Sequence, residues 1–129
     1  MLISGNTVDT AGHAGIYVKA PDAMVTNNVV RGASARGIET PTTIHATALN
    51  NRVTRSGSDG IVMSGPRILA RGNVVGRSFG RGLAGDGDAV TFASNTSYLN
   101  ATAGIELTGT ASADTIDRKI SFGNITGLR

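Results

Sequence analysis

An asparagine recurs along the chain at an almost constant interval. The copies are Asn6, Asn28, Asn51, Asn73 and Asn95, and successive copies are separated by 22, 23, 22 and 22 residues. A further asparagine, Asn124, follows after 29 residues, which assigns about seven extra residues to that repeat. Self-similarity at a fixed period of this length is typical of repeat proteins, in which each unit is one small structural module. The chain is therefore predicted to be a stack of repeats.

Two other residue types keep the same period. A glycine lies nine positions after each of the five asparagines, and an aliphatic residue follows it, as in Gly15-Ile16 and Gly37-Ile38. Around the asparagines, apolar positions alternate with polar ones in short runs, which is the pattern of strands with one face toward a core. No window has the apolar spacing of a helix, and β-branched residues are abundant. These features predict an all-β protein.

A repeat of about 22 residues that is built from short strands and turns predicts a solenoid. Its coils would stack at the inter-strand spacing of ~4.8 Å, so equivalent residues would lie above one another. A buried asparagine can then donate its amide to the asparagine of the next coil, so the five asparagines are predicted to form an internal ladder. The residue before each one is Gly5, Asn27, Asn50, Gly72 or Ser94, and is predicted to adopt positive φ at a corner.

Composition excludes several classes of protein. The 129 residues fit one domain, and the absence of cysteine excludes a disulfide scaffold, a cysteine-based zinc site and a thiol nucleophile. No apolar run is long enough to span a membrane, and the first residues do not resemble a signal peptide. Nucleic acid is not favoured as a partner, because no recognised motif accompanies the arginines and aromatic residues make up only 4% of the chain.

The motif Gly/Asn-Asn-x-Val followed by Gly-Ile, as in Gly5-Asn6-Thr7-Val8 with Gly15-Ile16, resembles the right-handed parallel β-helix family, the pectate-lyase-like superfold. The resemblance extends from Ile3 to about Thr126. It implies a right-handed parallel β-helix of about 5–6 coils with an internal Asn ladder. Family members include polysaccharide lyases, glycan epimerases, glycoside hydrolases, phage tailspikes and surface adhesins. The resemblance therefore implies an extracellular or cell-surface protein associated with carbohydrate.

The two ends of the repeat array carry a separate expectation. β-Helices usually protect their terminal strand edges with a cap, whereas here a repeat begins at residue 1. Residues 108–119 are polar and are predicted to be a loop insertion, after which a further coil begins at Ile120. Residues 1–129 are thus expected to form one β-helix domain. This domain is either a piece of a longer solenoid or is capped by a partner chain, which includes a second copy of itself.

Arginines indicate where a ligand could bind. The formal net charge is +3, and five arginines fall three to nine positions after a ladder asparagine. A planar guanidinium binds a carboxylate through two hydrogen bonds, so a column of arginines suits an acidic polysaccharide. The predicted ligand-binding residues are Arg31, Arg55, Arg77 and the aromatic Tyr98. The alternative is a surface ladder of salt bridges that binds no ligand.

Carboxylates supply the candidate catalytic residues. Asp59 shares one position of the repeat with Arg36 and Arg81. In a lyase or uronate epimerase of this family, such arginines would neutralise the uronate carboxylate while Asp59 removed a proton. Two flanking cations, however, would lower the pKa of Asp59 and make it a weak base.

A second pair of carboxylates, Asp86 and Asp88, is spaced suitably for a glycoside hydrolase or for weak calcium binding, but Gly-Asp-Gly-Asp also suits an ordinary turn. His13 and His45 do not share a position of the repeat, so they do not suggest a metal site, and no cofactor is predicted.

Three functions follow in order of preference. The first is a carbohydrate-associated module that binds an acidic polysaccharide through the arginines. The second is a structural or adhesive solenoid segment of the tailspike or surface-protein type, with no active site. The third is a complete polysaccharide lyase or uronate epimerase.

Overall fold

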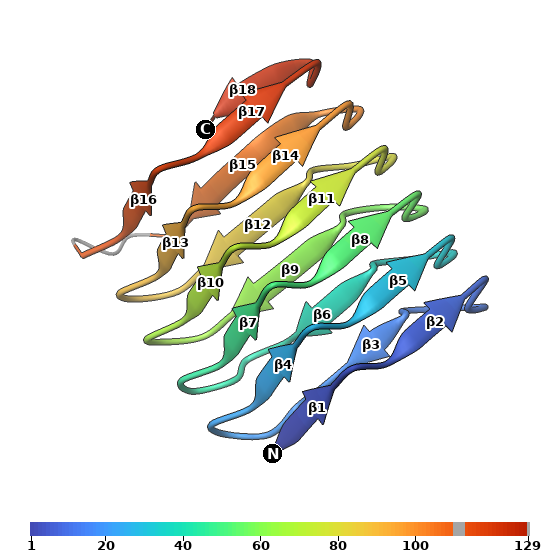
Figure 1. Ribbon diagram of the computed structural model, residues 1–129. Coiled ribbons are helices and arrows are strands. Elements are labelled where there is room, and N and C mark those ends of the chain that lie inside the picture. Colours follow the sequence, from blue (N-terminus) through green and yellow to red (C-terminus); the bar gives the residue numbers. More distant parts are fainter. Residues whose placement is uncertain (110–112, 129) are drawn as a thin grey trace.

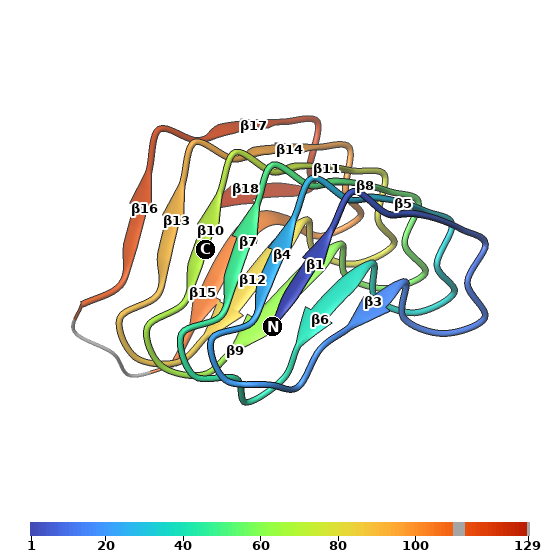
Figure 2. The same cartoon turned by 60° about the horizontal axis from the view of Figure 1, so that its bottom comes forward.

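A computed structural model describes residues 1–109 and 113–128. The described chain winds into six coils, and each coil contributes one strand to each of three parallel sheets (Figure 1). The two views together show the coils stacked on one another, with the three sheets wrapped around a common interior (Figures 1 and 2). The expected all-β parallel solenoid is confirmed. The described residues include no helix, and hence none that could cross a membrane.

The three sheets are named here in the order in which the chain enters them. Sheet A contains β1 (Leu2–Ser4), β4 (Met24–Thr26), β7 (Thr47–Leu49), β10 (Leu69–Arg71), β13 (Thr91–Ala93) and β16 (Thr115–Asp117). Sheet B contains β2 (Thr7–Asp9), β5 (Val29–Arg31), β8 (Arg52–Thr54), β11 (Val74–Gly76), β14 (Thr96–Tyr98) and β17 (Ile120–Phe122). Sheet C contains β3 (Ile16–Tyr17), β6 (Ile38–Thr40), β9 (Ile61–Ser64), β12 (Leu83–Asp86), β15 (Ala103–Thr108) and β18 (Thr126–Leu128).

The interior is filled by columns of equivalent residues. In sheet B, Val30, Val53 and Val75 are fully buried, and the next residue of this column, Ser97, is buried too. The Ser97 hydroxyl donates a hydrogen bond to the carbonyl of Gly104 at 2.7 Å, and Ser121, the next member of the column, donates to the carbonyl of Gly127 at 3.1 Å. Sheet A adds Phe92, the largest fully buried side chain. The core is therefore narrow and built mainly of small and β-branched side chains.

The predicted Asn ladder is present at every one of its five positions. The amide nitrogen Nδ2 of Asn6, Asn28, Asn51 and Asn73 donates to Oδ1 of the asparagine one coil further on, at 3.0–3.1 Å. The backbone nitrogens of the same four residues donate to those Oδ1 atoms as well, at 2.9–3.0 Å. All five residues that precede the ladder asparagines have positive φ, between 53° and 68°. The ladder thus satisfies the amides at the corner between sheets A and B.

The sequence-based register of the last coil is wrong. Ile120 pairs with Thr96, so Lys119, not Asn124, occupies the position equivalent to Asn95. Asn124 instead accepts a hydrogen bond from Nδ2 of Asn100 at 2.8 Å, at the other end of sheet B. The spacing of 24 residues between Thr96 and Ile120 means that this coil has two extra residues rather than seven.

The expected loop at 108–119 is also wrong in part. Thr108 ends β15, and β16 (Thr115–Asp117) pairs with β13 as a regular member of sheet A. Only residues 109–114 lie between the two strands, and of these, 110–112 fall outside the described residues.

The glycine column marks a place where the coils approach closely. A Cβ at Gly37, Gly60 or Gly82 would lie only 2.5–2.6 Å from the carbonyl oxygen of the next glycine in the column. It would also lie 2.1–2.2 Å from a side-chain atom of the sheet B core. Such distances are far shorter than van der Waals contacts, so only glycine fits where the chain enters sheet C.

Candidate functional site

The candidate catalytic residues lie at one edge of the outer face of sheet C. Asp59 is 9% exposed, and Arg81 of the next coil binds both of its oxygens. The Nε and Nη2 atoms of Arg81 donate to Asp59 at 3.1 and 2.8 Å, and the backbone nitrogen of Arg81 donates to the same carboxylate at 2.7 Å. The third nitrogen, Nη1, donates to Glu106 at 2.7 Å. Arg81 therefore links three consecutive coils.

This clamp determines the ionisation of Asp59. Partial burial acts to raise the pKa of the carboxyl, but the hydrogen bonds from Arg81 and the positive charges of Arg81 and Arg36 outweigh it. The pKa of Asp59 is therefore held below its ordinary value. The hydrogen bond to Asp59 in turn raises the pKa of Arg81, against the effect of burial, and Glu106 adds to the rise. Asp59 is thus a carboxylate at neutral pH, with both oxygens occupied.

Arg36 occupies the equivalent position one coil before Asp59, as expected, but its guanidinium hydrogen-bonds to Glu39 rather than to Asp59. Glu39 and Glu106 belong to an outward-facing row of sheet C that begins with Tyr17, and the middle members Val62 and Ala84 lie between the two glutamates. Both middle residues are buried despite facing outward, at 9% and 3% exposed. The structure brings Arg36, Asp59 and Arg81 to one sheet edge within a network of ion pairs, and their catalytic roles stay a prediction.

Sequence reasoning missed the two glutamates of this network. Both lie at the same position of the repeat, directly after the aliphatic residues Ile38 and Ile105. An alignment of all charged residues on the repeat, rather than of the arginines alone, would have placed them beside Arg36 and Arg81.

Two of the four candidate ligand-binding residues lie on the outer face of sheet B, and the other two lie at the corner that directly follows it. Arg31 and Tyr98 belong to one outward-facing column, formed by Asp9, Arg31, Thr54, Gly76, Tyr98 and Phe122. Arg55 and Arg77 directly follow the strand residues Thr54 and Gly76, and both have a φ of 57° at the corner where sheet B ends. Arg31 forms an exposed ion pair with Asp9 at 3.4 Å. We call Arg31, Arg55, Arg77, Tyr98 and Phe122 the sheet B face.

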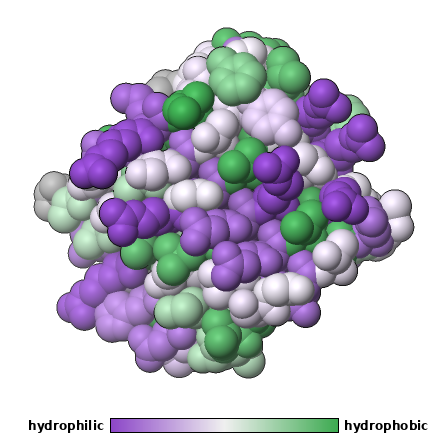
Figure 3. Space-filling model, in the orientation of Figure 1, coloured by the Kyte–Doolittle hydropathy of each residue, from purple (hydrophilic) through white to green (hydrophobic). Residues whose placement is uncertain are grey.

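Two of these arginines are available to a ligand. Arg55 and Arg77 are exposed. Within residues 1–109 and 113–128, neither guanidinium takes part in an ion pair or a side-chain hydrogen bond. Figure 3 shows the molecule in the orientation of Figure 1, with hydrophilic and hydrophobic side chains interspersed over its surface. A mixed surface of this kind offers charge and apolar area side by side.

The aromatic part of the sheet B face is a pair of rings. Tyr98 and Phe122 stack with ring centroids 5.6 Å apart and an angle of 15° between their planes. A Cβ at Gly76 would lie 2.2 Å from Cζ of Tyr98, so the tip of the tyrosine ring lies over the glycine of the preceding coil. Phe122 was not predicted as part of the site, because counting the last coil from Asn124 gave it the wrong position in the repeat.

The remaining candidates are dispersed. Asp86 ends β12, and the backbone turns at Gly87 (φ 155°) before Asp88, so the two carboxylates flank a turn. No group of three or more potential metal ligands occurs among the described residues. His45 lies between Asp22, whose Oδ1 is 3.1 Å from its Nδ1, and Arg67, whose Nη1 is 2.9 Å from its Nε2. His13 lies apart from this cluster, in the segment between sheets B and C.

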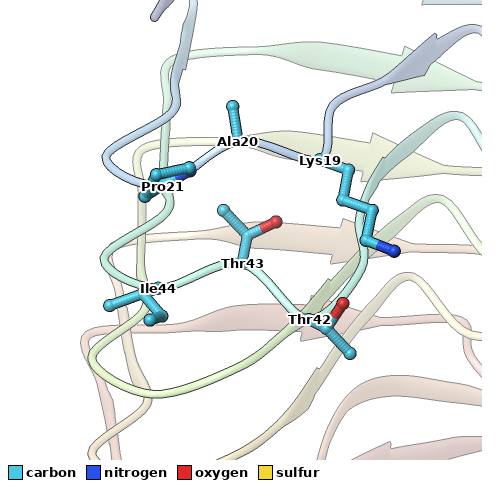
Figure 4. Close-up of a pocket in the computed structure, with 6 residues that line it drawn as sticks. All are labelled: Lys19, Ala20, Pro21, Thr42, Thr43 and Ile44. Carbon is cyan, nitrogen blue, oxygen red and sulfur yellow. The ribbon is translucent and has the colours of Figure 1, made fainter.

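A cavity of about 260 Å³ lies between the first two coils, where each passes from sheet C to sheet A (Figure 4). It is lined by Lys19, Ala20, Pro21, Thr42, Thr43 and Ile44. The second coil has one more residue here than the first, and Thr42 has a φ of 45°.

The fold and the ladder define a parallel β-solenoid with an internal Asn ladder. The family model described as a right handed beta helix region matches residues 1–128, and the chain belongs to this family. No curated protein sequence matches the chain.

Solved structures resemble the chain in fold. The periplasmic alginate epimerase AlgG is similar with a TM-score of 0.71 and 17% identity over 84% of this chain, and a double mutant of it with a TM-score of 0.73 at the same identity. The enzymatically active domain of tailspike protein 2 from bacteriophage CBA120 is similar with a TM-score of 0.70 and 13% identity over 89% of this chain. The chain spans 27% of the length of the epimerase and 22% of that of the tailspike domain.

Proposed function

We propose that the chain is a carbohydrate-binding β-helix module that holds an acidic polysaccharide on the sheet B face. The observation that carries the proposal is the position of Arg55 and Arg77. They occupy the same exposed corner of consecutive coils, and neither guanidinium is paired within the described residues. Arginines at equivalent positions of two coils, whose backbones are ~4.8 Å apart, suit a polymer that bears a carboxylate on every sugar.

Two comparisons support a carbohydrate ligand. One solved structure of similar fold is an alginate epimerase, and another is the enzymatically active domain of a phage tailspike. Alginate is a polymer of uronates, so its carboxylates match the chemistry of the arginines. The sheet B face is preferred to the edge of sheet C as the binding surface, because Arg81 already binds two carboxylates of this chain.

A structural or adhesive role without a ligand is the second candidate, and it is favoured by the ion pairs that join consecutive coils, Arg31 to Asp9 and Arg81 to Asp59. Catalysis as a lyase or uronate epimerase, with Asp59, Arg36 and Arg81, is the third. It would require Asp59 to exchange its bonds to Arg81 for a substrate proton, against the lowered pKa.

Affinity electrophoresis separates these candidates. The protein should be retarded in gels that contain alginate or polygalacturonate but not in gels that contain dextran, and added salt should weaken the effect. The Arg55→Ala/Arg77→Ala variant should lose most of the retardation. The control is Arg71→Ala/Arg118→Ala, which removes the same charge at the opposite end of sheet B, where sheet A passes into it and where Arg118 pairs with Asp117.

Equal retardation of the wild type and the Arg55→Ala/Arg77→Ala variant would reject the sheet B face as the site, and no retardation at all would favour the structural role. If ultraviolet absorbance rises during incubation with polyuronate because unsaturated products form, the protein is a lyase rather than a binding module.

A further inference from the structure

The cavity between the first two coils lies where one backbone hydrogen bond between neighbouring coils is missing. At this corner of the second coil, the backbone nitrogen of Thr43 donates to the carbonyl of Ser64 at 2.7 Å. In the third coil, the nitrogen of Gly65 donates to the carbonyl of Asp86 at 2.8 Å. Ala20 is the equivalent residue of the first coil, because it too lies four residues before the next strand of sheet A, but its nitrogen has no partner within the described part of the chain. The cavity is therefore lined by a residue with a free N–H donor.

Lys19 adds a positive charge beside that donor. Figure 4 shows its side chain extending from the first coil toward Thr42 of the second, along one side of the cavity. Within the residues that the structure describes, its ammonium group forms no ion pair. The acid nearest in the sequence, Asp22, is engaged by His45, whose Nδ1 is 3.1 Å from Oδ1 of the aspartate. An unpaired ammonium group and a backbone N–H together suit a carboxylate.

The opposite side of the cavity is apolar. Figure 4 places Pro21 and Ile44 there, and Ile44 is 50% exposed. Thr43 lies between the two sides and is buried. Its hydroxyl donates to the carbonyl of Pro41 at 2.9 Å, so it contributes wall rather than a further free donor. A ligand with a polar end and an apolar end would therefore satisfy the donors and cover apolar surface at once.

We propose that this cavity binds a short aliphatic monocarboxylate, with the carboxylate on the Lys19 ammonium and the Ala20 N–H and the alkyl chain against Pro21 and Ile44. Its volume of about 260 Å³ is that of about nine water molecules at ~30 Å³ each, which suits a chain of about four to six carbons. The site lies between sheets C and A, apart from the sheet B face, and does not rest on the function proposed above.

NMR titration of the full chain with sodium acetate, butyrate and hexanoate tests the site. The amide resonance of Ala20 should move downfield as its N–H gains an acceptor, and affinity should rise about two- to fourfold for each added CH₂ group. Butylammonium has the same chain with the opposite charge and should not bind. If butyramide binds as tightly as butyrate, the ammonium group plays no part and the proposal is overturned.

Lys19→Met removes the charge from an exposed side chain of similar length and should weaken butyrate binding about tenfold or more. Ile44→Ser should abolish most of the gain from acetate to hexanoate. The matched control is Lys119→Met, which removes the only other lysine of the chain and should bind as the wild type does.

Melting curves of the three variants should coincide with that of the wild type, so that losses of affinity are not losses of fold. An Ala20 resonance that moves with none of the carboxylates, or equal binding by the wild type and Lys19→Met, would overturn the inference. Neither result bears on polyuronate binding, because that test concerns arginines at a different corner of the solenoid.

Discussion

Arg81 holds the carboxylate of Asp59 at three points, through Nε, Nη2 and its own backbone nitrogen, at distances of 3.1, 2.8 and 2.7 Å. The two residues belong to consecutive coils and are 22 residues apart in the sequence. Because the pair is mostly shielded from water and fully hydrogen-bonded, it ties the coils together more strongly than an exposed ion pair would.

The stability of the protein should therefore depend on pH through Asp59. Its folded-state pKa lies below the unfolded value of about 3.9, so ionised Asp59 stabilises the fold above that value, and the contribution is lost as the pH falls through the folded-state pKa. Asp59→Asn should lower the free energy of unfolding by about 1–3 kcal/mol at pH 7. Urea denaturation should show the wild type and the variant converging below about pH 4.

Asp9→Asn is the control for this effect. Asp9 also pairs with an arginine of the next coil, Arg31, but at 3.4 Å and with both side chains more than half exposed. Its replacement should change stability by less than about 1 kcal/mol. If Asp59→Asn and Asp9→Asn lower the free energy of unfolding equally at pH 7, the buried Asp59–Arg81 pair stabilises the fold no more than an exposed pair does.

A substitution at the centre of the Asn ladder should destabilise the protein more than one at its end. Asn51→Leu removes the oxygen that accepts two hydrogen bonds from Asn28, at 3.0 and 3.1 Å, and leaves those buried donors without a partner. We expect the free energy of unfolding to fall by about 1–3 kcal/mol. Asn6, at the exposed end of the ladder, accepts no such bond within the described residues. Asn6→Leu should therefore lower the free energy of unfolding by less than Asn51→Leu does. A melting temperature for Asn51→Leu at or above that of the wild type would contradict the ladder's contribution.

The glycine column should tolerate no side chain. A Cβ at Gly60 would lie 2.1 Å from Cγ1 of Val75 and 2.6 Å from the carbonyl oxygen of Gly82. Neither the backbone at Gly82 nor the packed side chain of Val75 can move away easily. Gly60→Ala should therefore lower the free energy of unfolding by about 1–3 kcal/mol or more. Gly12→Ala is the matched control, because no atom lies within 4 Å of a Cβ there and φ is not positive. Thermal unfolding should separate the two variants; equal melting temperatures would show that the coils can move apart at Gly60.

How far the sequence predicts this structure depends on the kind of contact. Residues that face the same kind of residue in the next coil, such as Asn51 over Asn73 or Gly60 over Gly82, produce a periodic signal, so the fold, the ladder and the corners could all be predicted. Contacts between unlike residues have no such signal. Arg81 binds Glu106 three positions further along the repeat, and this pair depends on side-chain reach rather than on period.

The last coil was misread for a different reason. Lys119 replaces the ladder asparagine, and Asn124 happens to stand where a second, shorter stack of asparagines begins with Asn100. A count of asparagines alone cannot separate two stacks at opposite ends of sheet B, because both corners favour the same residue type. With the wrong register, Phe122 did not fall at the position equivalent to Tyr98, where the structure places it.

Lys119 itself offers a way to lengthen the ladder. It occupies the position equivalent to Asn95, and Arg118 before it has a φ of 45°, the conformation of the ladder corner. Lysine has no oxygen to accept a hydrogen bond, whereas an asparagine there could accept from both the backbone nitrogen and Nδ2 of Asn95, as Asn95 accepts from Asn73. Lys119→Asn should therefore raise the free energy of unfolding by about 0.5–1.5 kcal/mol. Lys119→Ala removes the same charge without adding an acceptor and should leave stability nearly unchanged. The comparison is made by urea denaturation of the three proteins side by side; if the asparagine and alanine variants have the same midpoint, position 119 does not continue the ladder.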